Sequence, residues 1–326
     1  MTTTYGDISP RTAAYAATKL EKRAIPYLCL EKFGQSRPLP KNHSQTIIFR
    51  RYERFPITPT PLTEGVTPNA RQLTTTDMPA TLVQYGDRVQ ITDVIRDTHE
   101  DPVLMEALDV LGEQAAQMIE TVRFNIIKGG TNVFFANGAA RSAVNTPLTR
   151  ALQRKIVRAL KRQDARKMTK VLRSTPNWGT ENVNAAYVGL CHPDCEGDIR
   201  NLDGFVPVED YGQMSPFEGE IGKCEDVRYV VSTIFEKWED AGATAGSMLS
   251  TGGSNADVYP ILFIARDAYG IVPLKGKRGI TPMVVNPKPS DSDPLGQRGH
   301  ASWKCYQTAR ILNDAWMVRA EVAVTD

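Results

Sequence analysis

The stretch that decides the fold runs from Thr46 to Asp97 and reads TIIFRRYERFPITPTPLTEGVTPNARQLTTTDMPATLVQYGDRVQITDVIRD. Its two ends are rich in the β-branched and aromatic residues that strands favour. Five prolines and many threonines occupy the region between them, so this region is an extended, stiff excursion with few apolar side chains to bury. Because excursions of this length are uncommon inside compact domains and usually serve binding, the sequence predicts an arm that leaves its own subunit and lies on another.

Six side chains of this excursion are candidates for contact with a neighbouring subunit. They are Arg50, Arg51, Arg54, Leu62, Glu64 and Val66. The alternative interpretation is a disordered insertion, since the middle is polar and rich in proline. Against that alternative, strand patterns flank the segment, and its two arms carry arginines rather than a low-complexity run.

Composition limits the class of protein. A chain of 326 residues exceeds the size at which one hydrophobic core usually keeps growing, so two lobes are expected. The net charge of +2 argues against a dedicated nucleic-acid binder, which is normally strongly basic. No apolar run approaches the roughly 20 residues that cross a bilayer, and the first 20 residues lack the apolar core of a signal peptide. We therefore expect a soluble protein that is synthesised in the cytosol and does not bind membranes.

The residues that most often carry chemistry do not form a recognisable site. The odd number of cysteines fits reduced thiols, and Cys191 and Cys195 lack the second pair that a zinc site requires. The glycine-rich segment 242–255 lacks the Lys-Ser/Thr of a phosphate-binding loop. A hydrolase that uses His192 and Asp194 would need a nucleophile that does not accompany them. The sequence therefore predicts no catalytic residue, no cofactor and no metal.

The clearest regular element is a helix from Pro102 to Lys128. Asp101 is a favourable N-cap, Pro102 fits the first helical position, and Gly129-Gly130 ends the pattern. Apolar residues between these limits recur at three- and four-residue steps, which indicates one buried stripe. At 1.5 Å per residue the helix is roughly 40 Å long, which suits a structural strut.

A second, strongly basic helix is expected from Pro147 to Leu172, in a basic segment that reaches Arg173. Its candidate functional residues are Arg154, Lys155, Arg158, Lys161, Arg162 and Arg166. Asp164 is the one acid among them. The cations can form a solvated face, pair with acids of a neighbouring subunit, or lie against DNA phosphates without sequence readout. The sequence leaves these three interpretations open.

A mixed lobe follows the basic helix. Runs of β-branched and aromatic residues predict strands at 185–190, 228–232 and 259–264. A proline-rich connector spans 282–294, and the chain closes with strands expected at 303–309 and 317–324. The chain therefore combines helices with strands, and we expect an α+β fold.

These elements, in this order, resemble the major capsid proteins of tailed double-stranded-DNA bacteriophages, which have the HK-ninety-seven-type fold. At motif level the chain is similar to the branch named after phage N-four, and the likeness covers nearly the whole chain from about Gln45. The motifs that carry it are Pro61–Pro68 (PLTEGVTP), Gln84–Asp87 (QYGD), Asp101–Leu104 (DPVL), His192–Asp194 (HPD), Gly219–Lys223 (GEIGK), Asp267–Gly270 (DAYG) and Asp293–Gln297 (DPLGQ).

The resemblance implies a division of the chain into four parts. Residues 1–45 would be an N-terminal arm and residues 46–97 an extended β-hairpin loop. Residues 98–175 and 296–326 would form a peripheral domain built on the long spine helix 102–128. Residues 176–295 would form an axial domain.

The resemblance also implies a function. The chain would be a structural major capsid (coat) protein without enzymatic activity, which self-assembles into the icosahedral shell around a phage genome. Its partners would be further copies of itself in hexamers and pentamers, a portal protein, scaffolding or decoration proteins, and packaged double-stranded DNA bound without specificity. It would act in the virion capsid after synthesis and assembly in the bacterial host cytoplasm. The alternative function is a nonspecific DNA-binding or DNA-packaging accessory protein that uses the basic helix 150–173.

Overall fold

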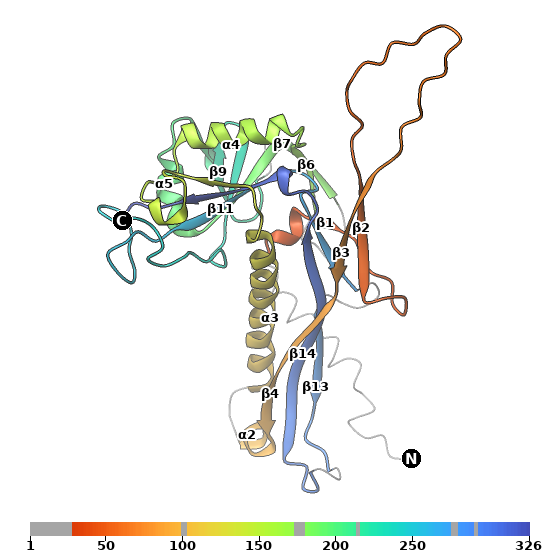
Figure 1. Cartoon of the computed structure of the whole chain (residues 1–326). Helices are drawn as coiled ribbons and strands as arrows, with labels where there is room; N and C mark the ends of the chain where they lie inside the picture. The colour runs from red at the N-terminus through yellow and green to blue at the C-terminus, as the bar shows by residue number, and fades with distance from the viewer. Residues whose placement is uncertain (1–27, 99–102, 173–179, 213–215, 275–279, 290–292) are drawn as a thin grey trace.

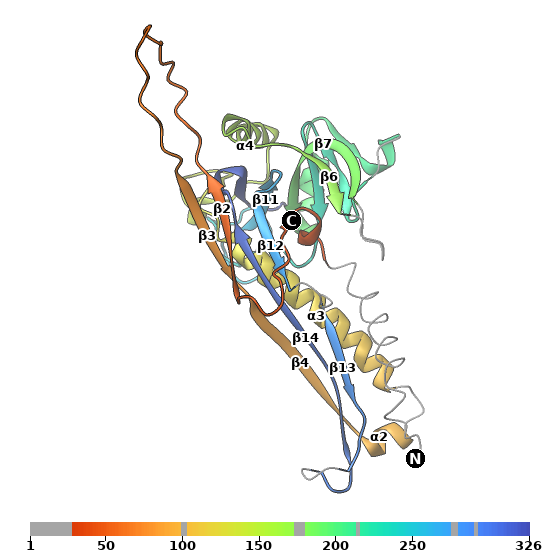
Figure 2. The same cartoon turned by 90° about the vertical axis from the view of Figure 1, so that its right-hand side faces the viewer.

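The computed structural model describes residues 28–98, 103–172, 180–212, 216–274, 280–289 and 293–326. These residues form an elongated lobe, a globular lobe and a hairpin that projects from the elongated lobe (Figures 1 and 2). Both lobes combine helices with sheets, which confirms the predicted α+β class.

The elongated lobe is a five-stranded sheet with one long helix on it. The strands are β1 (Gln35–Ser36), β12 (Tyr269–Pro273), β14 (Arg298–Ile311), β13 (Thr281–Val285) and β4 (Val83–Thr92). β14 pairs with β12, β13 and β4 and is the strand that joins most of the sheet together. Its side chains alternate between buried and half-buried, so Ala301, Trp303 and Cys305 all face the helix.

That helix, α3 (Val103–Lys128), is the predicted spine helix. It follows the short helix α2 (Asp93–Thr98) and runs along one face of the sheet (Figure 2). Leu108 and Leu111 are each 2% exposed against the sheet, as the apolar stripe predicted. The N–H groups of Gly129 and Gly130 bond to carbonyls three residues earlier and end the helix where expected. The predicted cap at Asp101 and Pro102 lies outside the described residues.

The globular lobe is an eight-stranded sheet. Its order is β5 (Val133–Phe135), β15 (Met317–Val322), β11 (Tyr259–Ile264), β7 (Thr180–Cys191), β10 (Val227–Val231), β9 (Glu220–Cys224) and β8 (Phe205–Pro207), with β6 (Met168–Leu172) also paired to β7. The strands predicted around 185–190, 228–232 and 259–264 are therefore present as β7, β10 and β11.

Helices cover both faces of this sheet. One face packs against α4 (Arg150–Arg162) and α5 (Glu196–Arg200). The other face packs against the C-terminal end of α3 and the 3-10 helix η3 (Leu30–Lys32). Four further 3-10 turns among the described residues connect these elements. They are η4 (Arg141–Ala143), η5 (Pro193–Cys195), η6 (Val208–Asp210) and η7 (Asp314–Trp316).

The basic helix is shorter than the sequence predicted. It ends at Arg162 instead of Leu172, because Asp164 adopts a left-handed backbone conformation (φ 51°) and the Ala165 N–H bonds back to the Leu160 carbonyl. Residues Met168–Leu172 then pair with β7 as strand β6. The expected helix over 150–173 is thus a helix, a turn and a strand, and Arg166 lies between the turn and the strand.

The predicted domain limits differ from the limits of the two lobes. α4 and β6, expected in the peripheral part, pack in the globular lobe, and so does β15. β13, expected in the axial part, pairs with β14 in the elongated lobe. β4, expected within the extended loop, is paired with β14 along ten residues. The chain crosses between the lobes several times, so each lobe is built from several separate segments of the sequence.

Three connections between the lobes meet at one place, which we call the joint. They are residues 128–133, 264–269 and 311–317. The hydrogen bonds that tie them together are Leu312 N–H to Ala268 O (2.9 Å), Ala265 N–H to Trp316 O (3.0 Å) and Thr131 N–H to the Asp314 carboxylate (3.0 and 3.1 Å). The joint thus connects the end of α3 to residues 264–269 and 311–317, the two segments that run from one sheet to the other.

Candidate assembly surfaces

The first candidate surface is carried by the projecting hairpin. β2 (Thr46–Tyr52) and β3 (Thr75–Thr81) pair antiparallel over their whole length. Between them residues 53–74, here called the projecting loop, extend far from both lobes (Figures 1 and 2). The predicted strands at the two ends of this stretch are therefore present, with the proline-rich part between them.

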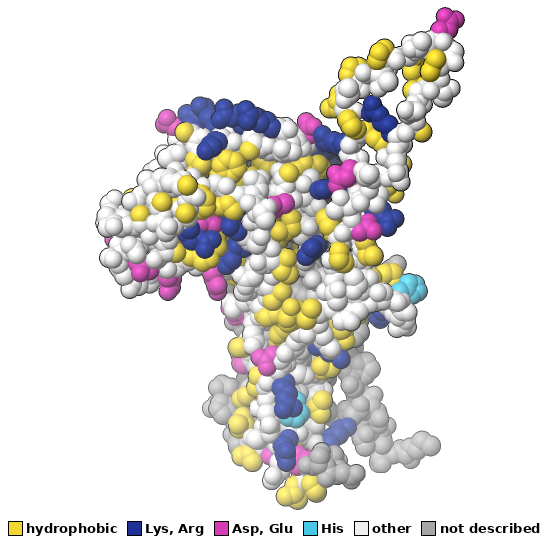
Figure 3. Space-filling view, viewed as in Figure 1, with side chains coloured by type: hydrophobic (Ala, Val, Ile, Leu, Met, Phe, Trp, Pro, Cys, Tyr) yellow, Lys and Arg dark blue, Asp and Glu magenta, His cyan; other side chains and the backbone are white. Residues whose placement is uncertain are grey.

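The projecting loop is exposed along its whole length. Ile57 is 98% exposed, Leu62 77% and Val66 64%. Figure 3 shows hydrophobic side chains distributed around the loop on a part of the molecule that has no core of its own. Such apolar surface is unfavourable in water, and in soluble proteins it marks a site that a partner covers.

The loop holds its shape through polar contacts instead of a core. The Arg71 guanidinium on one leg donates to the Pro56 carbonyl (2.8 Å) and to Thr60 Oγ1 (3.3 Å) on the other. At the tip, Gly65 adopts φ 77°, a left-handed conformation that glycine tolerates without steric cost. A loop with its legs tied loses less conformational entropy when a partner binds it.

At the root of the hairpin, Phe49 and Ala80 are buried against the elongated lobe.

The three candidate arginines are paired within their own chain. The pairs are Arg50 with Asp77 (2.8 Å), Arg51 with Glu53 (3.1 Å) and Arg54 with Asp164. The hydrogen bonds from Arg50 hold the pKa of Asp77 below its usual value. Because these pairs are exposed, each contributes little stability. Leu62, Glu64 and Val66 lie farther along the projecting loop, around its tip at Gly65.

The second candidate surface is the outer side of α4. The Thr149 hydroxyl caps the helix by accepting the Leu152 N–H (3.3 Å). Leu152, Ile156 and Leu160 form its buried stripe, as predicted. The cations therefore face outward, and Figure 3 shows them as a continuous row of Lys and Arg side chains over α4.

Two acids of the β9–β10 turn neutralise part of this row. Arg150 (3.0 Å) and Arg154 (2.9 Å) donate to the Glu225 carboxylate, while Lys161 (2.5 Å) and Lys167 (2.7 Å) donate to Asp226. These contacts lower the pKa of both carboxyls, mainly through Arg154 and Lys161. Sequence analysis did not identify Glu225 and Asp226, although their acidic pair between two strand patterns is a turn signal.

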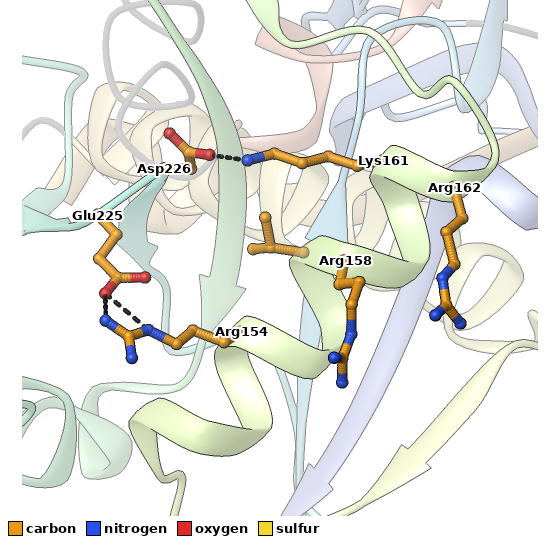
Figure 4. A pocket seen from close by; sticks show the side chains of 7 residues that line it. Arg154, Arg158, Lys161, Arg162, Glu225 and Asp226 are labelled. Carbon is orange, nitrogen blue, oxygen red and sulfur yellow. Dashed lines mark hydrogen bonds and ion pairs between the residues drawn. The ribbon is translucent and has the colours of Figure 1, made fainter.

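The remaining cations are not neutralised in this way. Arg158 and Arg162 point away from Glu225 and Asp226 in the shallow groove that these residues share (Figure 4). Neither has an ion-pair partner in the described part of the chain. Lys155 lies over the Phe134 ring, with its Nζ 5.4 Å from the ring centroid. Arg166 is separated from this row by the turn that ends α4.

The residues considered for catalysis or metal binding have structural roles. His192 Nδ1 accepts the Asp194 N–H (3.2 Å), and the Asp194 carboxylate accepts the Tyr259 hydroxyl (2.6 Å) at the start of η5. Cys191 and Cys195 are buried, which raises the pKa of both thiols. Within the described ranges, no group of three or more His, Cys, Asp or Glu residues could hold a metal, and no helix is long and apolar enough to cross a membrane.

Comparison with known proteins gives one family match and several structural matches. The family described as phage capsid protein matches residues 75–318. The capsid of Ralstonia phage GP4 is 15% identical, with a TM-score of 0.68 over 90% of this chain and 87% of that chain. The cyanophage Pam1 capsid asymmetric unit is 13% identical, with a TM-score of 0.63 over 93% and 92%. The head structure of Helicobacter pylori bacteriophage KHP40 is 10% identical, with a TM-score of 0.60 over 89% and 87%. No curated protein matches the sequence.

Proposed function

This chain belongs to the phage capsid protein family and is a structural coat protein, and we propose that it builds a closed icosahedral shell by laying its projecting loop on the neighbouring subunit. One observation carries the proposal. Ile57, Leu62 and Val66 are exposed on a loop whose legs are already tied together by Arg71. Many copies of one chain would bury this surface repeatedly, once in each contact around a ring.

The two lobes suggest how such a shell is arranged. We propose that the globular lobe is the axial domain, which gathers at the five-fold and quasi-six-fold axes as pentamers and hexamers. The elongated lobe, with α3 along its sheet, would then be the peripheral domain. A portal protein and scaffolding or decoration proteins are proposed as further partners, with assembly in the host cytoplasm. This function requires no enzymatic activity.

The outer row of α4 is proposed to contact packaged double-stranded DNA. Arg158 and Arg162 support the proposal, because Glu225 and Asp226 neutralise their neighbours and leave these two guanidinium groups directed outward (Figure 4). Contacts of this kind are blind to sequence and weaken as salt rises. The chain as a whole is nearly neutral, and half of the cations on α4 pair with Glu225 or Asp226. These facts give no support to a separate DNA-binding function.

Deletion of residues 57–71 tests the role of the projecting loop. Shortening the loop from 22 to 7 residues changes the loop-closure entropy by only about 1 kcal/mol, in favour of folding. The deletion variant should therefore stay soluble and folded, yet form no closed shells in negative-stain images. Normal shells from this variant would refute the proposal.

A further inference from the structure

A single buried carboxyl fixes the first described residues of the chain to the spine helix. Glu120 on α3 is 0% exposed, and its Oε1 accepts the backbone N–H groups of Cys29 (2.9 Å) and Leu30 (2.5 Å). Leu30 is itself fully buried between the lobes, and its carbonyl accepts the Tyr269 hydroxyl (2.5 Å). The segment 28–33 therefore depends on Glu120 for the satisfaction of two buried donors.

The surroundings of Glu120 compensate its charge only in part. Its second oxygen, Oε2, has no hydrogen-bond partner among the described residues. The nearest cationic atom, Arg123 Nη1, is 4.0 Å away and lies closer to Glu31, at 3.3 Å. Burial outweighs the favourable contacts and raises the pKa of Glu120 from its usual 4.5 to about 7.

We propose that Glu120 is a proton-linked anchor, which holds the segment 28–33 against α3 more tightly when the carboxyl is neutral than when it is charged. The inference goes beyond the coat function and does not depend on it. It concerns the attachment of the N-terminal segment to the body of the subunit, and it makes this attachment sensitive to pH near neutrality.

The direction of the effect follows from proton linkage. In the anchored state Glu120 has its proton until the pH rises through about 7, whereas a hydrated carboxyl in the released state loses it near 4.5. The anchored state therefore binds the extra proton between these values, so the stabilisation is complete at low pH and is lost as the pH rises through 7. With these two pKa values, release should become about tenfold more favourable between pH 6 and pH 8.

The titratable and charged groups around Glu120 come from α3, the segment 28–33, β12 and β14. Arg123 on α3, Cys29 and Glu31 in the segment 28–33, and Tyr269 on β12 act on Glu120 directly, while Lys32 acts on Cys29 and Cys305 on β14 lies near Arg123. Burial raises the pKa of the Cys29 and Cys305 thiols and of the Tyr269 phenol, so these three groups stay neutral across this pH range. Glu31 competes with Glu120 for Arg123, which contributes to the incomplete compensation.

Amide hydrogen exchange of the full-length chain tests the anchor directly, because the exchanging protons are those that Glu120 accepts. Protection factors for the Cys29 and Leu30 amides, corrected for intrinsic exchange, should fall about tenfold from pH 6 to pH 8. The Glu120→Gln variant should lose this dependence, since the amide oxygen still accepts but cannot titrate. Glu106→Gln, at an exposed position on the same helix, should retain it.

Two results would overturn the inference. The first is a wild-type protection factor that does not change between pH 6 and pH 8, and this measurement decides the question even if Glu120→Gln fails to fold. The second is a Glu120→Gln variant that keeps the tenfold fall, because the pH dependence would then belong to another group.

Discussion

Replacing Ile57, Leu62 and Val66 together by serine should weaken assembly while the isolated subunit stays as stable as before. The three side chains are 98%, 77% and 64% exposed, so they contribute little to their own fold. If a neighbouring subunit buries them, each contributes at least roughly 1.5 kcal/mol, or roughly 4–5 kcal/mol per contact. Since about 1.4 kcal/mol is a factor of ten, each contact should become roughly a thousandfold weaker.

The assay compares assembly and stability in the same preparations. Light scattering over a concentration series reports the concentration at which shells form, and thermal unfolding reports the stability of the subunit. Serine at Thr58, Thr63 and Thr67 is the matched control, because these residues occupy the same exposed loop but contribute much less apolar surface. Assembly of the first variant at the wild-type concentration would refute the reasoning. A fall of several degrees in its unfolding midpoint would show instead that the loop belongs to a core.

Three further predictions concern the strut, the basic row and cross-linking. Leu108→Asp places an unpaired charge at a position 2% exposed, which should cost roughly 3–5 kcal/mol and give insoluble protein in a fractionation assay; soluble, assembling protein would contradict it. Arg158→Gln with Arg162→Gln should leave shell formation intact and lower the DNA content of purified particles, whereas failed assembly would assign these arginines to a subunit interface. An isopeptide cross-link through the hairpin would need a lysine, but no lysine occurs between Thr46 and Glu100. A denaturing, reducing gel should therefore show one band at 36.1 kDa, and covalent ladders would contradict this prediction.

The elements that the sequence predicted best are those with a sustained local pattern. α3 repeats its apolar stripe for 26 residues and ends at two glycines, and β11 is an uninterrupted apolar run. The end of α4 was missed because helix formers continue beyond Arg162, while strand β6 depends on pairing with β7. Such pairing joins residues that are distant in sequence and leaves no local signal.

For the candidate surfaces, the sequence predicted where the elements lie but not which side chains pair with one another. Prolines and strand patterns located the projecting loop, since both act through the local backbone. The ion pairs could not be predicted, because Arg154 and Glu225 are 71 residues apart and meet only when α4 packs on the sheet. Arg50 likewise binds Asp77 within its own hairpin. Its predicted contact with a neighbouring subunit stays a prediction.

The joint between the lobes has a mechanical consequence. Ladders of hydrogen bonds hold each sheet, so a rotation of one lobe against the other would change the backbone of residues 128–133, 264–269 and 311–317 and the packing between the lobes. A Cβ added at Gly130 would lie 2.8 Å from Asp314 Oδ1 and 2.9 Å from Met317 Cε, so a side chain at this position would force the joint to shift. If both lobes contact neighbouring subunits in the proposed shell, the angle between the lobes contributes to the local curvature. A few substitutions at this joint would therefore alter the radius of the particle while both lobes keep their own packing.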